Sequence, residues 1–98
     1  MKKKYFTITG LCHYYGSDFL KKGMRVKLIK EPDNQFDKEA IRVELKGLGK
    51  IGYVANSTHT VLGETMSAGR IYDHMRKKAK GKILIVTPRG VICELKED

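Results

Sequence analysis

The sequence predicts one mainly β domain (a β-rich α+β fold): a small, partly open barrel of about six strands with one or two short helices. Three observations predict it. Short segments that alternate apolar and polar residues, as half-buried strands do, recur along the chain. Turn residues separate them about every eight to twelve positions. No repeat, linker or low-complexity tract divides residues 1–98, so a single domain accounts for all of them.

The first half of the chain predicts strands only. Residues 1–4 form a basic start that we expect to be flexible. Gly10 suggests a bulge or a close backbone approach in the first strand, and Pro32 ends the second because proline cannot donate to a ladder. The predicted strands are Tyr5 to Cys12, Met24 to Ile29, about Ala40 to Lys46, and Lys50 to Ala55.

The second half predicts a helix followed by strands. Asn56-Ser57-Thr58 offers capping residues, and apolar residues then recur at helical spacing, which predicts a short helix from Ser57 to Ser67. The stretch from Gly69 to Met75 alternates and predicts a strand. A hairpin around Pro88-Arg89-Gly90 should join Ile83–Val86 to Val91–Leu95.

The net charge of +9 is unevenly placed. Residues 1–30 and 66–98 carry most of the lysines and arginines, whereas residues 31–65 are acidic. A charge this high in a small domain favours polyanionic partners, with nucleic acid ahead of an acidic membrane surface.

The two cysteines, Cys12 and Cys93, predict neither a zinc site nor a disulfide framework. We expect two half-buried thiols in a reducing compartment, and we expect no cofactor and no metal. No apolar run has the length of a signal peptide or a membrane span. The expected location is the cytoplasm, with nucleoid association if the source is bacterial, and a membrane partner is not expected.

The stretch from Glu31 to Val43 reads E-P-D-N-Q-F-D-K-E-A-I-R-V and joins two of the predicted strands. It is too long for a two-residue hairpin turn. Its proline, aspartates and asparagine set φ or hydrogen-bond their own backbone. A turn of this composition, held between two strands, is a suitable place to fix a binding group rigidly.

Three pieces of the chain together resemble the HIRAN domain family. They are Gly10-Leu11-Cys12-His13-Tyr14, the stretch from Glu31 to Val43, and Ile51-Gly52-Tyr53, in the family's order and at its approximate spacing. The resemblance implies an OB-like barrel, a non-catalytic module that binds single-stranded DNA, and recognition of a free 3′-hydroxyl end. It also connects the domain to DNA repair, with any helicase or nuclease activity supplied by a separate chain.

The resemblance also implies roles for individual residues. Asp37 takes the terminal hydroxyl, Phe36 packs against the terminal nucleotide, Tyr14 belongs to the stacking surface, and Tyr53 lies on the pocket wall. With neighbouring polar, aromatic and basic side chains, the expected nucleic-acid-binding set is His13, Tyr14, Tyr15, Asn34, Phe36, Asp37, Lys38, Tyr53 and Asn56. Further phosphate contacts are expected from Lys21, Lys22, Arg76, Lys77 and Lys78.

An aspartate in a basic domain has a physical use at a DNA end. Phosphates repel it, but it can accept a hydrogen bond from the 3′-hydroxyl, which an internal nucleotide lacks. Such a charged hydrogen bond contributes about 1.5–3 kcal/mol, or roughly a ten- to hundred-fold preference for an end.

The chain departs from the family pattern at four positions. Cys12 and His13 stand where an arginine and an aromatic are usual, and Gln35 and Phe36 where proline and tyrosine are common. The change at Cys12 removes a phosphate contact, for which Lys38, His13 or the basic start could compensate.

Other interpretations remain open. Asp33, Asn34 and Asp37 could serve only as turn formers, Phe36 could plug the barrel end, and residues 76–82 could be a solvated turn. A protein-interaction module in a repair or replication complex is the main alternative function. A nuclease that holds Mg²⁺ on Glu31, Asp33, Asp37 and Glu39 is a second one.

Overall fold

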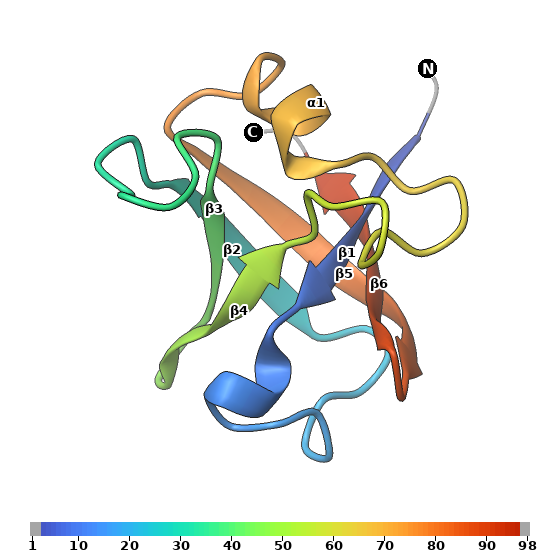
Figure 1. The fold of residues 1–98 in the computed structure, drawn as a ribbon. Coiled ribbons are helices and arrows are strands. Elements are labelled where there is room, and N and C mark those ends of the chain that lie inside the picture. Colours follow the sequence, from blue (N-terminus) through green and yellow to red (C-terminus); the bar gives the residue numbers. More distant parts are fainter. Residues whose placement is uncertain (1–2, 97–98) are drawn as a thin grey trace.

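The structure, a computed structural model, describes residues 3–96. Within this part of the chain, six antiparallel strands close into a barrel in the order β1-β4-β3-β2-β5-β6 (Figure 1). The strands are β1 (Lys4–Thr9), β2 (Arg25–Lys30), β3 (Ile41–Leu45), β4 (Gly49–Val54), β5 (Lys78–Thr87) and β6 (Gly90–Lys96). A short 3-10 helix, η1 (Leu11–His13), and one α-helix, α1 (Ala68–Tyr72), complete the described elements.

The predicted mainly β, OB-like barrel is confirmed. The expectation that it is partly open is wrong, because β6 pairs with β1 as well as with β5 and so closes the sheet. Alternate residues of the strands point inward, and Phe6, Ile8, Leu28 and Ile83 are fully buried. At Gly81 of β5 a Cβ atom would lie 2.8 Å from Cζ of Phe6. Glycine is therefore required there, since the ring of Phe6 fills the space that a side chain would need.

The predicted helix from Ser57 to Ser67 is wrong. This segment consists of turns, and Gly63 adopts the left-handed region with φ of 57°. Its end pairs with β1 instead: the Met66 N–H donates to the Tyr5 carbonyl at 2.7 Å. Tertiary pairing thus replaces the hydrogen bonds of a helix.

The predicted strand from Gly69 to Met75 is also wrong, because α1 occupies Ala68–Tyr72. The side chain of Ser67 accepts a hydrogen bond from the Arg70 N–H and so caps the helix. Ala68 and Ile71, three residues apart, are buried on the same face. An alternating pattern over so few residues did not distinguish a strand from a short helix.

The first and fifth strands also differ from their predicted bounds. β1 ends at Thr9, because Gly10 turns the backbone into the left-handed region with φ of 74°, and η1 follows. Lys78 to Lys82 belong to β5, so the basic run is not a solvated turn. Lys4 begins β1, and residues 1 and 2 lie outside the described part.

The two thiols are not half-buried as expected. Cys12 is exposed on η1, whereas Cys93 is buried in β6, where burial raises its pKa to about 12. Among residues 3–96, no helix is long and apolar enough to cross a membrane.

Candidate nucleic-acid interface

Six of the nine expected binding residues border one open cavity of about 510 Å³ on the outside of the barrel. They come from the turn before β3, from the segment after η1 and from the end of β4: Tyr14, Asn34, Phe36, Asp37, Tyr53 and Asn56. Five further lining residues were not predicted, namely Thr9, Ala40, Val54, Ser57 and Thr60. We call this hollow the end cavity. Ser57 and Thr60 lie in the segment whose predicted helix does not form, so no pattern placed them here.

The turn between β2 and β3 is built by its own side chains. Asn34 Oδ1 accepts the backbone N–H of Phe36 at 2.8 Å and of Asp37 at 2.9 Å. Asp37 Oδ1 accepts the N–H of Glu39 at 2.9 Å, and the Glu31 N–H donates to the Ala40 carbonyl at 2.8 Å. Asn34 and Asp37 are therefore turn formers, and this role holds Asp37 in place at the cavity.

The second carboxylate oxygen of Asp37 faces Asn56. Asn56 Nδ2 donates to Asp37 Oδ2 at 2.9 Å, and Asn56 Oδ1 accepts the N–H of Gly69 at 2.8 Å. The first turn of α1 thus orients the amide of Asn56, which in turn orients the carboxylate. Each oxygen of Asp37 accepts one hydrogen bond from these partners, and a carboxylate has about four acceptor positions in all. The carboxylate of Asp37 can therefore accept a hydrogen bond from a further donor.

Phe36 stands at the tip of the turn with 98% of its surface exposed. The interpretation that it plugs the barrel end is wrong. A phenyl ring that packs on nothing in the domain is available for contact with a flat partner.

Tyr14 and Tyr53 form an aromatic wall of the cavity. Their ring centroids lie 6.5 Å apart at an interplanar angle of 51°. Lys50 Nζ lies 5.6 Å from the ring centroid of Tyr14 and 4.9 Å from that of Tyr53. The wall therefore combines stacking surfaces with a positive charge.

Glu31 connects this wall to the turn. Tyr53 Oη donates to Glu31 Oε1 at 2.9 Å, Asn34 Nδ2 donates to the same oxygen at 3.0 Å, and Lys50 Nζ lies 3.6 Å from Oε2. Burial raises the pKa of Glu31, but hydrogen bonds from Asn34 and Tyr53 and the charge of Lys50 outweigh it, so the pKa is lowered. The hydrogen bond to Tyr53 and the charge of Glu31 raise the pKa of Lys50. Both groups are thus charged at neutral pH, and Glu31 is a structural ion-pair partner.

The Mg²⁺ alternative receives no support from these contacts. Glu31 is also 3.5 Å from Arg42 Nη1, so two cations already neutralise it. Within the described residues, no three His, Cys, Asp or Glu side chains gather as metal ligands would.

A comparison with known protein families shows to which family the chain belongs. The family model of the HIRAN domain matches residues 2–87. The chain belongs to the HIRAN family. No curated protein matches the chain. Membership in the HIRAN family supports the interpretation that the chain is a DNA-binding module.

Two crystal structures share the fold of this HIRAN domain. A protein from Lactobacillus plantarum (structural genomics target LpR91B) is 21% identical, with a TM-score of 0.65 over 94% of this chain and 88% of that one. The HIRAN domain of human HLTF is 18% identical, also with a TM-score of 0.65, over 95% of this chain and 72% of that one. At these identities the likeness concerns the barrel itself.

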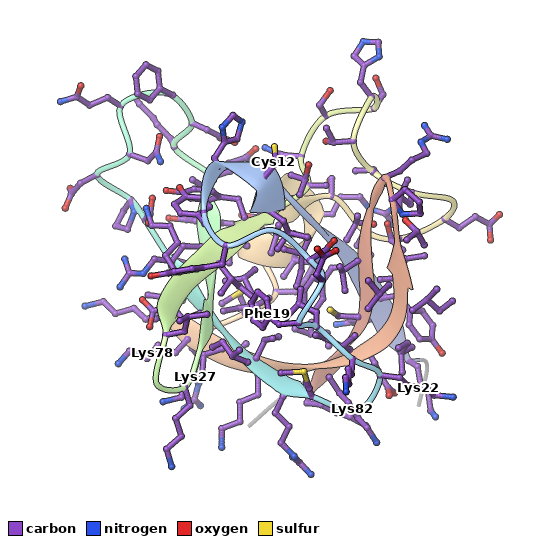
Figure 2. The ribbon with its side chains drawn as sticks, turned by 90° about the horizontal axis from the view of Figure 1, so that it is seen from below. Cys12, Phe19, Lys22, Lys27, Lys78 and Lys82 are labelled. Atoms are coloured by element: carbon purple, nitrogen blue, oxygen red, sulfur yellow. The ribbon has the colours of Figure 1, made fainter. Side chains whose placement is uncertain are left out.

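Three expected binding residues of this HIRAN domain, His13, Tyr15 and Lys38, are exposed but do not border the end cavity. Tyr14 and Tyr15 are both exposed, because they follow η1 and do not alternate along a strand. The expected phosphate contacts Lys21, Lys22, Arg76, Lys77 and Lys78 do not line it either. Figure 2 shows Lys22 and Lys78 on the side of the barrel opposite Cys12.

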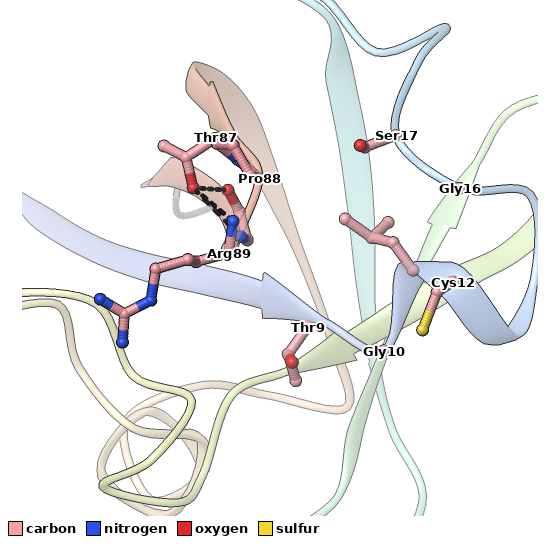
Figure 3. A pocket seen from close by; sticks show the side chains of 10 residues that line it. Thr9, Gly10, Cys12, Gly16, Ser17, Thr87, Pro88 and Arg89 are labelled. Atoms are coloured by element: carbon pink, nitrogen blue, oxygen red, sulfur yellow. Dashed lines mark hydrogen bonds between the residues drawn. The ribbon is translucent and has the colours of Figure 1, made fainter.

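Cys12, at the position where the resemblance leads us to expect an arginine, lines a second hollow of about 220 Å³. Cys12 lines it together with Thr9, Gly10 and the β5–β6 turn, from which the Arg89 side chain extends away from Cys12 (Figure 3). Thr87 Oγ1 holds the turn by accepting the N–H groups of Arg89 and Gly90. Thr9 lines both hollows, and Arg89 is a cation at the smaller one that the sequence did not indicate.

Proposed function

We propose that this HIRAN domain binds single-stranded DNA and recognises a free 3′-hydroxyl end without catalysing a reaction. The observation that carries the proposal is the fixed carboxylate of Asp37, which lies at one cavity with Phe36, Tyr14 and Tyr53. A carboxylate among aromatic rings in a basic protein accepts a hydroxyl hydrogen and repels a phosphate.

The terminal nucleotide would contact the cavity through its base and its sugar. Phe36 and the Tyr14–Tyr53 wall present aromatic surfaces, and each stacked base contributes about 1–3 kcal/mol irrespective of sequence. Asp37 accepts the 3′-hydroxyl, and Asn56 keeps the carboxylate turned toward it. A 3′-phosphate would place negative charge beside Asp37 and leave the end unbound.

The preceding phosphates require cations along the path of the strand. Lys50 lies over the aromatic wall, and Arg89 borders the adjoining hollow across Thr9. Binding through phosphates should weaken steeply with salt, whereas the alternative of a protein-interaction surface predicts a much shallower dependence.

The test is fluorescence anisotropy of a short labelled DNA strand that ends in a 3′-hydroxyl or in a 3′-phosphate. The wild-type domain should prefer the hydroxyl end by about ten- to hundred-fold, and Asp37→Asn should remove the preference while retaining the shape of the turn. Asp33→Asn is the matched control, because Asp33 is an exposed residue of the same turn that does not line the cavity.

Equal binding of both strands by the wild type would leave a single-strand binder without end recognition. Absence of binding at low salt would contradict the nucleic-acid function altogether and favour a protein partner. Loss of the preference in Asp33→Asn as well would show that the turn, and not the Asp37 carboxylate, is responsible.

A further inference from the structure

A second cationic surface lies on the outside of β2, β5 and β6. A groove of about 220 Å³ runs there between basic side chains, with Val26 and Gly81 at its floor. In Figure 2, Lys27, Lys78 and Lys82 project outward on the side opposite Cys12. We call this surface the basic face and define it by Arg25, Lys27, Lys46, Lys78, Lys80, Lys82 and Lys96.

The strand register places like charges directly opposite one another on this face. Lys27 of β2 pairs with Lys80 of β5, and Lys80 pairs with Lys96 of β6, so three lysines stand abreast across three strands. In the next row, Arg25 of β2 pairs with Lys82 of β5. Like charges directly opposite in a sheet are destabilising. Arg25 and Lys82 form such a like-charge pair.

Among residues 3–96, the strand register places two carboxylates opposite cations of the face, one paired with a cation outside it and one with Lys96 of the face and with Lys3. Glu44 lies opposite Lys27 on β3, but its Oε2 accepts from Arg42 Nε at 2.7 Å. Glu94 lies opposite Lys82 on β6 and pairs with Lys96 at 3.1 Å and with Lys3 at 3.7 Å. Among the described residues, the cations that define the face outnumber these two carboxylates, so its net charge there is positive, which a polyanion complements.

The basic face lies on the far side of the barrel from the end cavity. In the closed order of strands, β4, which carries Tyr53, is opposite β5, and β1 is opposite β2. One terminal nucleotide in the end cavity therefore cannot touch the basic face, and the two surfaces must meet different nucleotides.

The composition of the groove favours duplex over single-stranded nucleic acid. Single-strand sites combine cations with aromatic side chains that stack on bases. None of the described residues that line this groove is aromatic. In a duplex the bases are already stacked inside, and regularly spaced phosphates form the outer surface. Outward side chains two residues apart on a strand repeat about every 6.8 Å, twice the phosphate rise of about 3.4 Å per DNA strand.

We propose that the basic face is a second binding site, which holds the phosphate backbone of a duplex segment. This proposal rests on the proposed function in one respect only, that the partner is a nucleic acid. The site contacts phosphates alone and so does not read sequence. Together the two sites would fit DNA that has a duplex part and a single-stranded 3′ end.

The experiment measures binding of a blunt duplex whose 3′ ends both carry phosphate, so that neither a single strand nor a 3′-hydroxyl is present. Anisotropy at several salt concentrations should give a steep dependence for the wild type. The variant Arg25→Gln/Lys27→Gln removes two exposed cations from the face, and should reduce the slope of log K against log salt by about 1.8, at roughly 0.9 per phosphate contact. Its melting temperature should equal or exceed that of the wild type, because like-charge repulsion is relieved.

The matched control compares single variants. Arg70→Gln removes one exposed charge from α1, outside both surfaces, and should leave the slope nearly unchanged, whereas Arg25→Gln or Lys27→Gln alone should reduce it by about 0.9. An equal loss in the control would overturn the proposal in favour of net charge alone. An unchanged slope in Arg25→Gln/Lys27→Gln would also overturn it. The proposal would also be overturned if binding to phosphatidylserine vesicles required Arg25 and Lys27 while binding to the duplex did not, since the face would then bind a membrane.

The two sites can fail separately. Asp37→Asn should retain duplex binding, and Arg25→Gln/Lys27→Gln should retain the preference of a single strand for a 3′-hydroxyl over a 3′-phosphate. If the wild type does not bind the duplex but retains the preference for a 3′-hydroxyl, only the second site is contradicted. If the wild type binds the duplex without that preference, only the first site is contradicted.

Discussion

At the scale of single residues, Asp37 shows how a structural and a binding role coincide. Its Oδ1 closes the turn through Glu39, and its Oδ2 is oriented by Asn56. The motif around Glu31 to Val43 located this residue in advance, because Asp and Asn in a turn hydrogen-bond their own backbone. Its partner Asn56 lies 19 residues further along the chain, in a different loop. Only the fold brings the two together.

Phe36 allows binding to be separated from stability. Because its ring is 98% exposed, Phe36→Ala should leave the melting temperature unchanged. The same variant should weaken single-strand binding by about 1–3 kcal/mol, since one stacking surface is lost. Tyr15→Ala is the control, an exposed aromatic that does not border the end cavity, and it should retain most of the affinity. If Tyr15→Ala loses more than Phe36→Ala, the DNA lies outside the cavity.

Glu31 makes stability depend on pH. Its folded-state pKa is lowered, so its contribution is fully present above the ordinary value of 4.5 and is lost as pH falls through the folded-state pKa. Glu31→Gln should destabilise the domain at pH 7, by about 1.5–3 kcal/mol for hydrogen bonds to a charged group. The difference from the wild type should shrink on acidification. Urea unfolding at several pH values measures it, and a difference that persists at the lowest pH would indicate lost packing instead.

At the scale of elements, alternation predicted strands such as β2 and β3, in which buried residues alternate with more exposed ones. The region 57–75 could not be assigned in the same way. Val61, Leu62, Thr65 and Met66 have helical spacing, yet the Met66 N–H bonds to β1 and Thr7 Oγ1 accepts the Leu62 N–H. These hydrogen bonds to a distant strand outweigh local propensity and leave no signal in a local pattern.

Two glycines test how tightly the elements pack. Gly81→Ala should destabilise the barrel by about 1–3 kcal/mol, because its Cβ would lie 2.8 Å from the Phe6 ring and 3.1 Å from Val26 Cγ2. In Gly69→Ala the nearest atom, at 2.6 Å, is Oε1 of Glu39, the end of a flexible exposed side chain. That variant should be neutral or stabilising by about 0.5–1 kcal/mol, since alanine favours the helix α1. Thermal unfolding of both variants compares the tightly packed barrel interior with the exposed surroundings of α1. Equal losses of stability in the two variants would contradict this difference.

At the scale of the whole molecule, charge could be counted from the sequence but not placed. The basic run from Arg76 to Lys82 was visible, and a solvated turn was its simplest interpretation. Only the pairing of β2, β5 and β6 shows that its lysines stand beside Arg25, Lys27 and Lys96. The family resemblance predicted residues that line the end cavity, because its motifs are local in the sequence. The basic face has no such motif, because it depends on the register between strands that are distant in the sequence.

The placement of two sites on opposite sides of one barrel leads to a prediction about DNA shape. A duplex with a single-stranded 3′ overhang should bind more tightly than either part alone, because the second contact becomes intramolecular. The overhang must pass around a molecule of 34 × 30 × 28 Å, so affinity should rise with overhang length, reach a maximum and then fall slowly. Asp37→Asn and Arg25→Gln/Lys27→Gln should each lower this maximum, since each weakens one of the two sites. A steady rise without a maximum, or a maximum that neither variant lowers, would mean that the strand follows a single continuous surface.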